Sequence, residues 1–194
     1  MNFKLTIVLV LAAISCSTPK TGNPRVEITT RYGDIVVELY PEQAPVTVAA
    51  FLSYIDSGYY EKSSFYRVLT AEDQPSFAPK SEIIQGGIWK TNPAALKNIP
   101  GIPHETTDKT KLSHTNGTLS LAREAPGTAS TEFFICVGDQ KGYDYGGENN
   151  ADGQGYAAFG RVVQGMDVVK RMHKAPQRDG QFTPQIHITL LRRE

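Results

Sequence analysis

Arg67, Gln85 and Phe134 are the residues of this sequence whose side chains could act on a bound group. Each stands in a short apolar run, SFYRVL, EIIQGG or EFFICV, where a plain core strand would carry an aliphatic residue. A guanidinium stays charged and presents rigid N–H donors, and an amide can both donate and accept hydrogen bonds. With the apolar face of a phenyl ring, these groups could hold and polarise a ligand without a covalent step.

Strand geometry predicts that each of these side chains points away from a core face. Successive side chains of a strand point to opposite faces, so Gln85 lies opposite Ile84, and Arg67 lies opposite Tyr66. By the same count, Phe134 lies opposite the phenylalanine that precedes it. The two glycines after Gln85 let the chain bend beside it without a side chain in the way.

Motifs for nucleophiles and metals are weak by comparison. Cys136 lies in the apolar run FFIC, so we interpret it as a small buried hydrophobic residue and not as a reactive thiol. His104 and Glu105 begin like the zinc motif HExxH, but Asp108 stands where the second histidine should be. The glycine-rich run YDYGGENNADGQG lacks the spacing and the final glutamate of a calcium loop. We therefore expect neither a metal nor a cofactor.

Short strand-like segments make up most of the chain after residue 24. RVEITT and DIVVEL flank turn residues at Tyr32 and Gly33 and predict a hairpin. Helices are predicted in APVTVAAFLSYIDSG, ending near Gly58, and in GMDVVKRMH. The other expected strands are SFYRVL, EIIQGG, TLSLAR, EFFICV, YAAFGRVV and QIHITLL. This pattern predicts one mainly β domain with two helices, arranged as a closed barrel.

Five segments resemble, in their order and spacing, a cyclophilin-type peptidyl-prolyl cis-trans isomerase: SFYRVL, IIQGG, GTLSLAR, STEFFIC and AAFGRVVQGMDVV. The resemblance covers residues 25–192. It implies a closed eight-stranded antiparallel barrel, capped by an α-helix at each end, with a substrate groove on its outer wall. It also implies catalytic roles for Arg67, Gln85 and Phe134 in the isomerisation of Xaa-Pro bonds, without a cofactor. The substrate-binding residues that it implies are Ile83, Ala122, Arg123, Glu132, Tyr143 and Tyr156.

The groove departs from the usual pattern of this family. Glu82 and Ile83 stand where many members carry an aromatic residue and a methionine, Arg123 replaces an asparagine, Glu132 a glutamine and Tyr156 a histidine. We therefore expect the cyclic peptide inhibitor that names the family to bind weakly. A second function stays open, that of a peptide-binding or chaperone module that isomerises poorly.

The segment TAEDQPSFAPKSE, which precedes Gln85, is longer than the connection that the family usually has there. Its prolines and serines mark a loop. We hypothesise that Phe77 folds over the groove and supplies an aromatic wall. The alternative is a mobile surface loop with one apolar contact.

The N-terminus carries a basic Lys4, an apolar run and small residues before Cys16, which is typical of a secretion signal. The run is too short to span a bilayer, and AISC resembles a lipobox in which Cys16 is lipidated. Ordinary cleavage beside an incidental cysteine is the alternative. The predicted organisation is a signal peptide over 1–16, a polar tether over 17–24 and the isomerase domain over 25–194. We expect a lipoprotein of the cell envelope, in the periplasm or at the outer surface.

The overall charge points to no nucleic-acid partner. Twenty basic residues balance twenty acidic ones among the 194, so the chain has no excess positive field to attract a polyanion. The expected partners are proline-containing peptides and unfolded exported proteins. We expect membrane contact only through the N-terminal lipid, and a monomer, because no exposed apolar run calls for a second chain.

Overall fold

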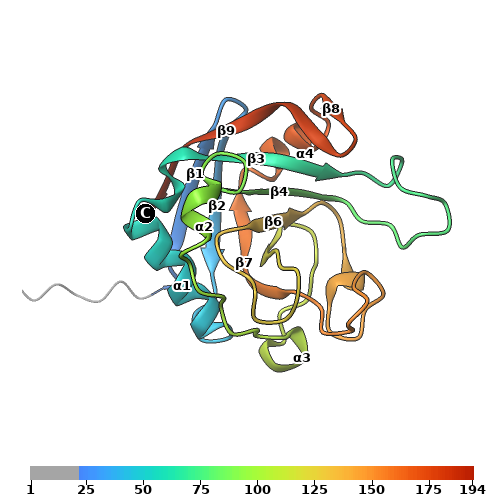
Figure 1. Ribbon diagram of the computed structural model, residues 1–194, viewed down its shortest axis with the longest axis horizontal. Coiled ribbons are helices and arrows are strands. Elements are labelled where there is room, and N and C mark those ends of the chain that lie inside the picture. The colour runs from blue at the N-terminus through green and yellow to red at the C-terminus, as the bar shows by residue number, and fades with distance from the viewer. Residues whose placement is uncertain (1–21) are drawn as a thin grey trace, which may run out of the picture.

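The computed structural model describes residues 22–194, so the predicted signal peptide and Cys16 lie outside the described residues. The described chain is mainly β (Figure 1). Its strands are β1 (Arg25–Thr30), β2 (Gly33–Leu39), β3 (Ser63–Leu69), β4 (Ile83–Gly87), β5 (Thr118–Leu121), β6 (Phe133–Cys136), β7 (Ala157–Gln164), β8 (Gln177–Arg178) and β9 (Gln181–Arg193). Its helices are α1 (Pro45–Asp56), α2 (Pro93–Leu96), α3 (Thr107–Thr110) and α4 (Met166–His173), with 3₁₀ turns at Tyr59–Lys62 and Lys141–Tyr143.

Eight strands close into an antiparallel barrel, as predicted. They follow the order β1-β2-β7-β5-β6-β4-β3-β9, and β9 pairs back onto β1. The remaining strand, β8, is a two-residue piece that pairs with β9. Closure leaves no free edge among these eight strands, so residues on the outer wall of the barrel have a rigid support.

The two predicted helices are the longest ones, α1 and α4. Helix α1 begins at Pro45, whose fixed φ suits the first turn, and Glu105 accepts hydrogen bonds from the backbone N–H groups of Val46 and Thr47. The helix ends at Asp56, and Gly58 follows with a φ of 73°, a conformation that suits glycine after a helix. Helices α2 and α3 were not predicted, because single turns of four residues carry no hydrophobic period. No helix among residues 22–194 has the length and apolar character needed to cross a bilayer.

The apolar side chains separate into a barrel interior and a smaller outer cluster. Phe51, Phe133 and Phe159 pack in the interior with their rings tilted against one another. The outer cluster consists of Ile83, Phe134, Cys136 and Tyr143. The predicted alternation is therefore confirmed for β4 and β6. Cys136 is fully buried, as predicted, and burial raises the pKa of its thiol.

The prediction for Tyr66 was wrong, because β3 contains a bulge. Phe65 pairs with Gly86 and Arg67 pairs with Gln85, so Tyr66 has no partner on β4. The register against β9 shifts at the same place. An extra residue in one strand offsets the alternation, and Tyr66 therefore lies on the outer wall beside Arg67. Both residues belong to the groove side of the barrel.

Candidate active site

Four neighbouring strands place Arg67, Gln85, Phe134 and Ser120 in one row across the outer wall. Arg67 pairs with Gln85, Gln85 with Phe134, and Phe134 with Ser120, on β3, β4, β6 and β5. Paired residues of adjacent antiparallel strands present their side chains on the same face. The register therefore brings together the three predicted catalytic residues, which lie up to 67 positions apart in the sequence.

An aromatic cluster surrounds Phe134. Its ring centroid lies 5.3 Å from that of Tyr143 and 5.5 Å from that of Tyr156, and the Tyr156 ring stands nearly perpendicular to it. The His114 ring stacks at 5.9 Å, tilted by only 14°. With Ile83, these rings form an apolar wall next to the exposed Arg67.

The groove has two adjoining pockets. The smaller, of about 250 Å³, is lined by the apolar cluster and by Arg67 and Gln85. The larger, of about 490 Å³, continues past Glu132, Trp89 and Tyr66. Both pockets share Arg67, Gln85, Ala122 and Arg123 in their walls, so Arg67 and Gln85 stand where the two compartments meet.

All the predicted catalytic and substrate-binding residues line one or both of these pockets. Sequence reasoning missed several further lining residues, because they follow from the ends of loops and from the bulge. They include Tyr66, Leu69, Ser81, Trp89 and Asn149. No signal in the sequence of β3 marks Tyr66, because tyrosine is common in strands and the bulge depends on the pairing of β3 with its two neighbours.

Arg67 has one hydrogen-bond partner within the described residues. Its Nη1 donates to Gln85 Oε1 at 3.0 Å. Gln85 Nε2 in turn donates to the Tyr66 hydroxyl at 2.7 Å. The remaining guanidinium N–H groups face the open groove, where they can bind a ligand oxygen or nitrogen.

The close approach of Glu132 and of β3 to β4 explains the glycine pair. A Cβ on Gly87, which has a φ of 145°, would overlap the Glu132 carboxylate. A Cβ on Gly86 would lie 2.9 Å from the carbonyl oxygen of Ser64. Both glycines are therefore required by packing between strands, and at Gly87 also by the backbone conformation.

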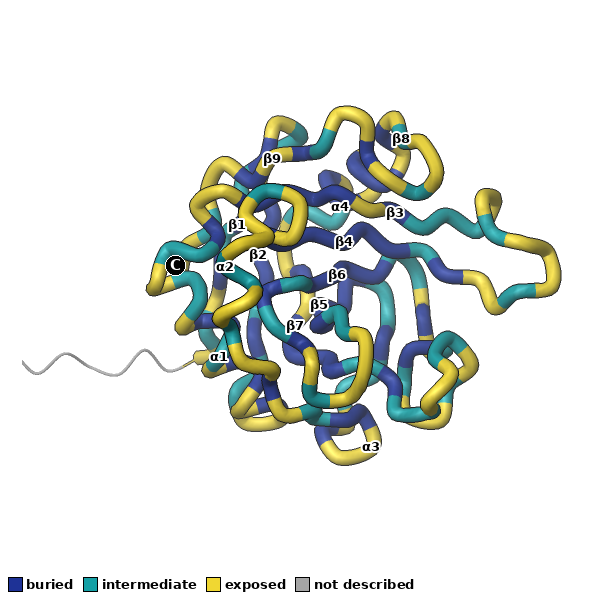
Figure 2. The backbone as a smooth tube through the Cα atoms, viewed as in Figure 1, coloured by how far each residue is buried: buried dark blue, intermediate teal, exposed yellow. Residues whose placement is uncertain are grey.

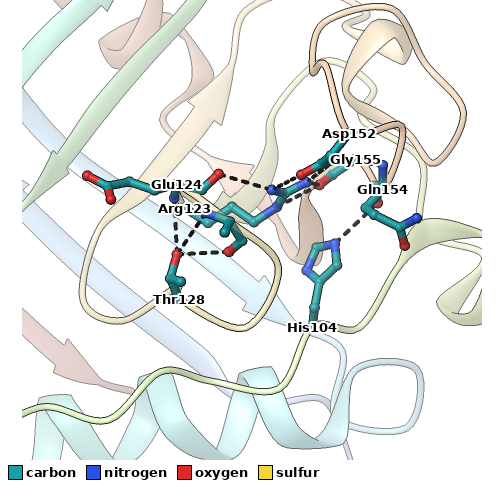
Figure 3. A network of polar contacts seen from close by, with 8 residues as sticks. His104, Arg123, Glu124, Thr128, Asp152, Gln154 and Gly155 are labelled. Atoms are coloured by element: carbon teal, nitrogen blue, oxygen red, sulfur yellow. Dashed lines mark hydrogen bonds and ion pairs between the residues drawn. The ribbon is translucent and has the colours of Figure 1, made fainter.

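Arg123 lines the groove, but its guanidinium is bound within the protein (Figure 3). It donates to both carboxylate oxygens of Asp152, at 2.6 and 2.9 Å, and to the carbonyl oxygens of Gly155 and Glu124. The hydrogen bonds from Arg123 lower the pKa of Asp152 to about 2. The Arg123 guanidinium also lies 5.1 Å from the Tyr156 ring centroid. Its predicted contact with substrate therefore depends on its stem and not on free donors.

Ser120, His114 and Asp144 have the contacts of a catalytic triad without the access. His114 lies 2.9 Å from Ser120 Oγ through Nε2 and 2.7 Å from Asp144 Oδ1 through Nδ1. A serine nucleophile must reach its substrate, yet both Ser120 and His114 are fully buried behind Phe134. The trio therefore supports the Phe134 ring and the start of the loop over residues 144–155.

The hypothesis that Phe77 covers the groove was wrong. Its side chain is 91% exposed at the end of the β3–β4 connection, which projects from the barrel (Figures 1 and 2). Internal bonds hold this connection away from the groove: the Gln74 side-chain amide donates to the carbonyl oxygens of Thr70 and Ser81, and Lys80 Nζ donates to the carbonyl oxygen of Pro75. Its base contacts the 144–155 loop, where Asn149 Nδ2 lies 2.9 Å from Ser81 Oγ.

Comparison with known proteins identifies this architecture. The family model described as "Cyclophilin type peptidyl-prolyl cis-trans isomerase/CLD" matches residues 25–192. The chain belongs to the cyclophilin family. It is accordingly a peptidyl-prolyl cis-trans isomerase, an enzyme that accelerates rotation about Xaa-Pro bonds.

Curated bacterial relatives carry the same activity in their names. The chain is 34% identical over 171 residues to a peptidyl-prolyl cis-trans isomerase of Acinetobacter baylyi, covering 88% of this chain and 82% of the relative. It is 35% identical over 144 residues to peptidyl-prolyl cis-trans isomerase B of Escherichia coli, covering 74% and 80%. Among solved structures, a cyclophilin-type isomerase of Cryptosporidium parvum superposes with a TM-score of 0.68 at 23% identity, over 89% of this chain and 98% of that one. This likeness concerns the cyclophilin fold.

Proposed function

We propose that Arg67 is the residue that lowers the rotational barrier of the bound prolyl bond. Rotation must overcome about 18–20 kcal/mol, because the C–N bond has partial double-bond character. At the twisted midpoint this character is lost, and the nitrogen regains a lone pair. A fixed cationic donor stabilises that midpoint more than either planar isomer. The observation that carries the proposal is the exposed guanidinium, held at the junction of two pockets by its hydrogen bond to Gln85.

The apolar wall grips the proline while the rest of the peptide turns. Ile83, Phe134 and Tyr156 offer a surface that suits a pyrrolidine ring, and the smaller pocket has room for one such ring. Gln85 assists on the carbonyl side of the bond through its amide. The larger pocket leaves space for a neighbouring residue of the peptide. A structure of the Cryptosporidium parvum relative was determined in the presence of the dipeptide Ala-Pro, which supports a short proline-containing ligand.

The test is a proline isomerisation assay on short Xaa-Pro peptides, comparing the wild type with Arg67→Ala. Loss of one transition-state donor predicts a fall in kcat/KM on the order of 10²-fold or more. Equal rates for the two proteins would refute the role of Arg67.

The proposed clients are exported proteins whose folding waits on slow prolyl isomerisation. The support is the signal-like N-terminus, in which Cys16 closes a run that resembles a lipobox. In this proposal the lipid holds the enzyme in the cell envelope, and the domain acts as a monomer on chains emerging beside it. Mass spectrometry of the mature protein tests this, with a diacylated N-terminal Cys16 expected. An unmodified residue at another cleavage site would contradict the lipoprotein proposal and leave the enzymatic proposal intact.

A further inference from the structure

A continuous chain of hydrogen bonds leads from Arg67 back to a buried carboxylate. Arg67 donates to Gln85 Oε1 at 3.0 Å, Gln85 Nε2 donates to the Tyr66 hydroxyl at 2.7 Å, and this hydroxyl donates to Glu132 Oε2 at 2.6 Å. Tyr66 is 3% exposed and Gln85 9% exposed. The inner part of the chain is therefore shielded from water, and its members have few alternative partners.

The Glu132 carboxylate determines which group donates and which accepts along this chain of hydrogen bonds. An ionised carboxylate only accepts hydrogen bonds. Glu132 Oε1 accepts from the backbone N–H groups of Ile88 and Trp89, at 2.9 and 3.1 Å, and from the Thr131 hydroxyl. The second oxygen, Oε2, accepts the hydrogen bond that the Tyr66 hydroxyl donates. The tyrosine oxygen is then left to accept a hydrogen bond from Gln85.

This direction determines which way the amide of Gln85 is turned. The two ends of a glutamine amide have nearly the same shape and differ only in donor and acceptor character. Because the Tyr66 oxygen accepts, the NH₂ end of Gln85 turns toward it, and the carbonyl end turns toward Arg67. In the opposite orientation the NH₂ group would face the guanidinium, and two donors would oppose each other.

We propose that Tyr66 and Glu132 are positioning residues that fix the orientation of the Gln85 amide and thereby aim the guanidinium of Arg67 at the prolyl bond. This inference rests on the proposed role of Arg67. It assigns Glu132 a task different from the substrate contact that the resemblance implied. It also gives the bulge in β3 a function, because the bulge brings the Tyr66 hydroxyl to the outer wall.

The chain of hydrogen bonds from Arg67 to Glu132 should be disrupted at acidic pH. Burial raises the pKa of Glu132, although hydrogen bonds from Tyr66 and from backbone N–H groups oppose the shift. The other ionisable groups near this carboxylate are Tyr66 and Arg67 on β3 and Tyr60 in the 3₁₀ turn before β3. Burial raises the pKa of both tyrosines, so they stay neutral. Protonated Glu132 would donate a hydrogen bond to the Tyr66 hydroxyl, and the tyrosine oxygen would no longer be held as an acceptor for Gln85. The orientation of Gln85 that aims Arg67 therefore exists above the raised pKa of Glu132 and is lost as the pH falls through that pKa.

The test compares Glu132→Gln, Tyr66→Phe and the double variant with the wild type, with kcat and KM measured separately. A glutamine at 132 keeps its oxygen on the two backbone N–H groups and presents an NH₂ to Tyr66, which then donates to Gln85 and turns its amide over. We expect kcat to fall about tenfold in each single variant with little change in KM, a smaller loss than removal of an aligned donor causes. The double variant should lose no more than either single variant, because both break one chain. Glu42→Gln, an exposed site with the same change, is the matched control and should keep wild-type kcat.

A pH series compares the wild type with Glu132→Gln and adds a second reading. Its kcat should fall on acidification, while Glu132→Gln should be low throughout with no acid limb from this residue. Wild-type kcat in both single variants, additive losses in the double variant, or a change in KM alone would overturn the inference. If Arg67→Ala has lost activity in the same assay, such a result leaves the role of Arg67 intact. If Arg67→Ala is also fully active, the proposed role of Arg67 fails and the inference fails with it.

Discussion

The groove contains two arginines in opposite states. Arg67 is exposed and makes one hydrogen bond among residues 22–194, to Gln85. Arg123, which lines the same pockets, has a side chain only 2% exposed and makes five hydrogen bonds to its own protein. A guanidinium that is saturated by internal partners supports a structure, whereas one with spare donors can act on a ligand. The difference supports the proposal that β3 and β4 carry the chemistry and that Arg123 fixes the wall of the groove beside them.

The supporting region is the loop over residues 144–155, which is held near both ends. Asp144 accepts from Ser113 Oγ and from the backbone N–H of His114. Near the other end, Arg123 binds Asp152 and Gly155. This loop carries no predicted catalytic residue. Its attachments should therefore affect stability more than the rate of the reaction.

Among changes to the supporting region, Arg123→Ala should have the largest effect. Loss of charge-assisted hydrogen bonds to the buried backbone at Gly155 should cost roughly 2–3 kcal/mol, which corresponds to a fall in Tm of about 4–12 °C. Activity at a temperature where the variant is folded should change little. Arg178→Ala is the control, because its side chain is 87% exposed. A large loss of kcat in stable, folded Arg123→Ala would contradict the division between the two arginines.

Asp144→Asn should have a smaller effect that depends on pH. Burial alone would raise the pKa of Asp144, but hydrogen bonds from His114 and Ser113 outweigh it and lower the pKa below the ordinary 3.8. The wild-type carboxylate therefore adds stability that is present above the ordinary pKa and is lost as the pH falls through the lowered one. At neutral pH we expect the variant to be less stable by about 1–2 kcal/mol, from the lost bonds to a charged group. Urea unfolding across a pH series should show that the difference in free energy of unfolding between the two proteins shrinks in acid. A difference that stays constant with pH would refute the explanation.

Phe77→Ala should change neither activity nor stability beyond about 0.5 kcal/mol, as expected for an exposed site. The phenyl ring is 91% exposed and contacts neither pocket. Peptide affinity and Tm measured side by side would detect an effect. A clear loss of peptide affinity would mean that the β3–β4 connection does reach the bound peptide.

Local sequence patterns were enough to predict a mainly β domain closed as a barrel, whereas the number of strands and most of the groove residues came from the resemblance to the cyclophilin family. Alternation along β4 and β6 separates Ile84 and Phe133 from Gln85 and Phe134, and both separations are observed. Alternation failed at Tyr66, because a bulge depends on how β3 meets both of its neighbours and not on its own sequence.

The partners of the buried polar groups could not be predicted either. His114 and Asp144 lie 30 positions apart, and Arg123 and Asp152 lie 29 apart. Only the closed barrel brings such pairs together. For the same reason the sequence did not reveal that the donors of Arg123 are taken up by internal hydrogen bonds, whereas Arg67 makes a single one, to Gln85, among the described residues.

The most direct test of the account is the exchange rate between cis and trans forms of an Xaa-Pro peptide held by excess protein, measured by NMR on the wild type and on Arg67→Ala. With the protein in excess and far above its Kd, essentially every peptide is bound, so the rate reports rotation and not affinity. We predict that the bound peptide exchanges on the order of 10²-fold more slowly in the variant, while its affinity and the protein's Tm stay close to those of the wild type. Unchanged exchange on a fully bound peptide would contradict the claim that this guanidinium lowers the barrier.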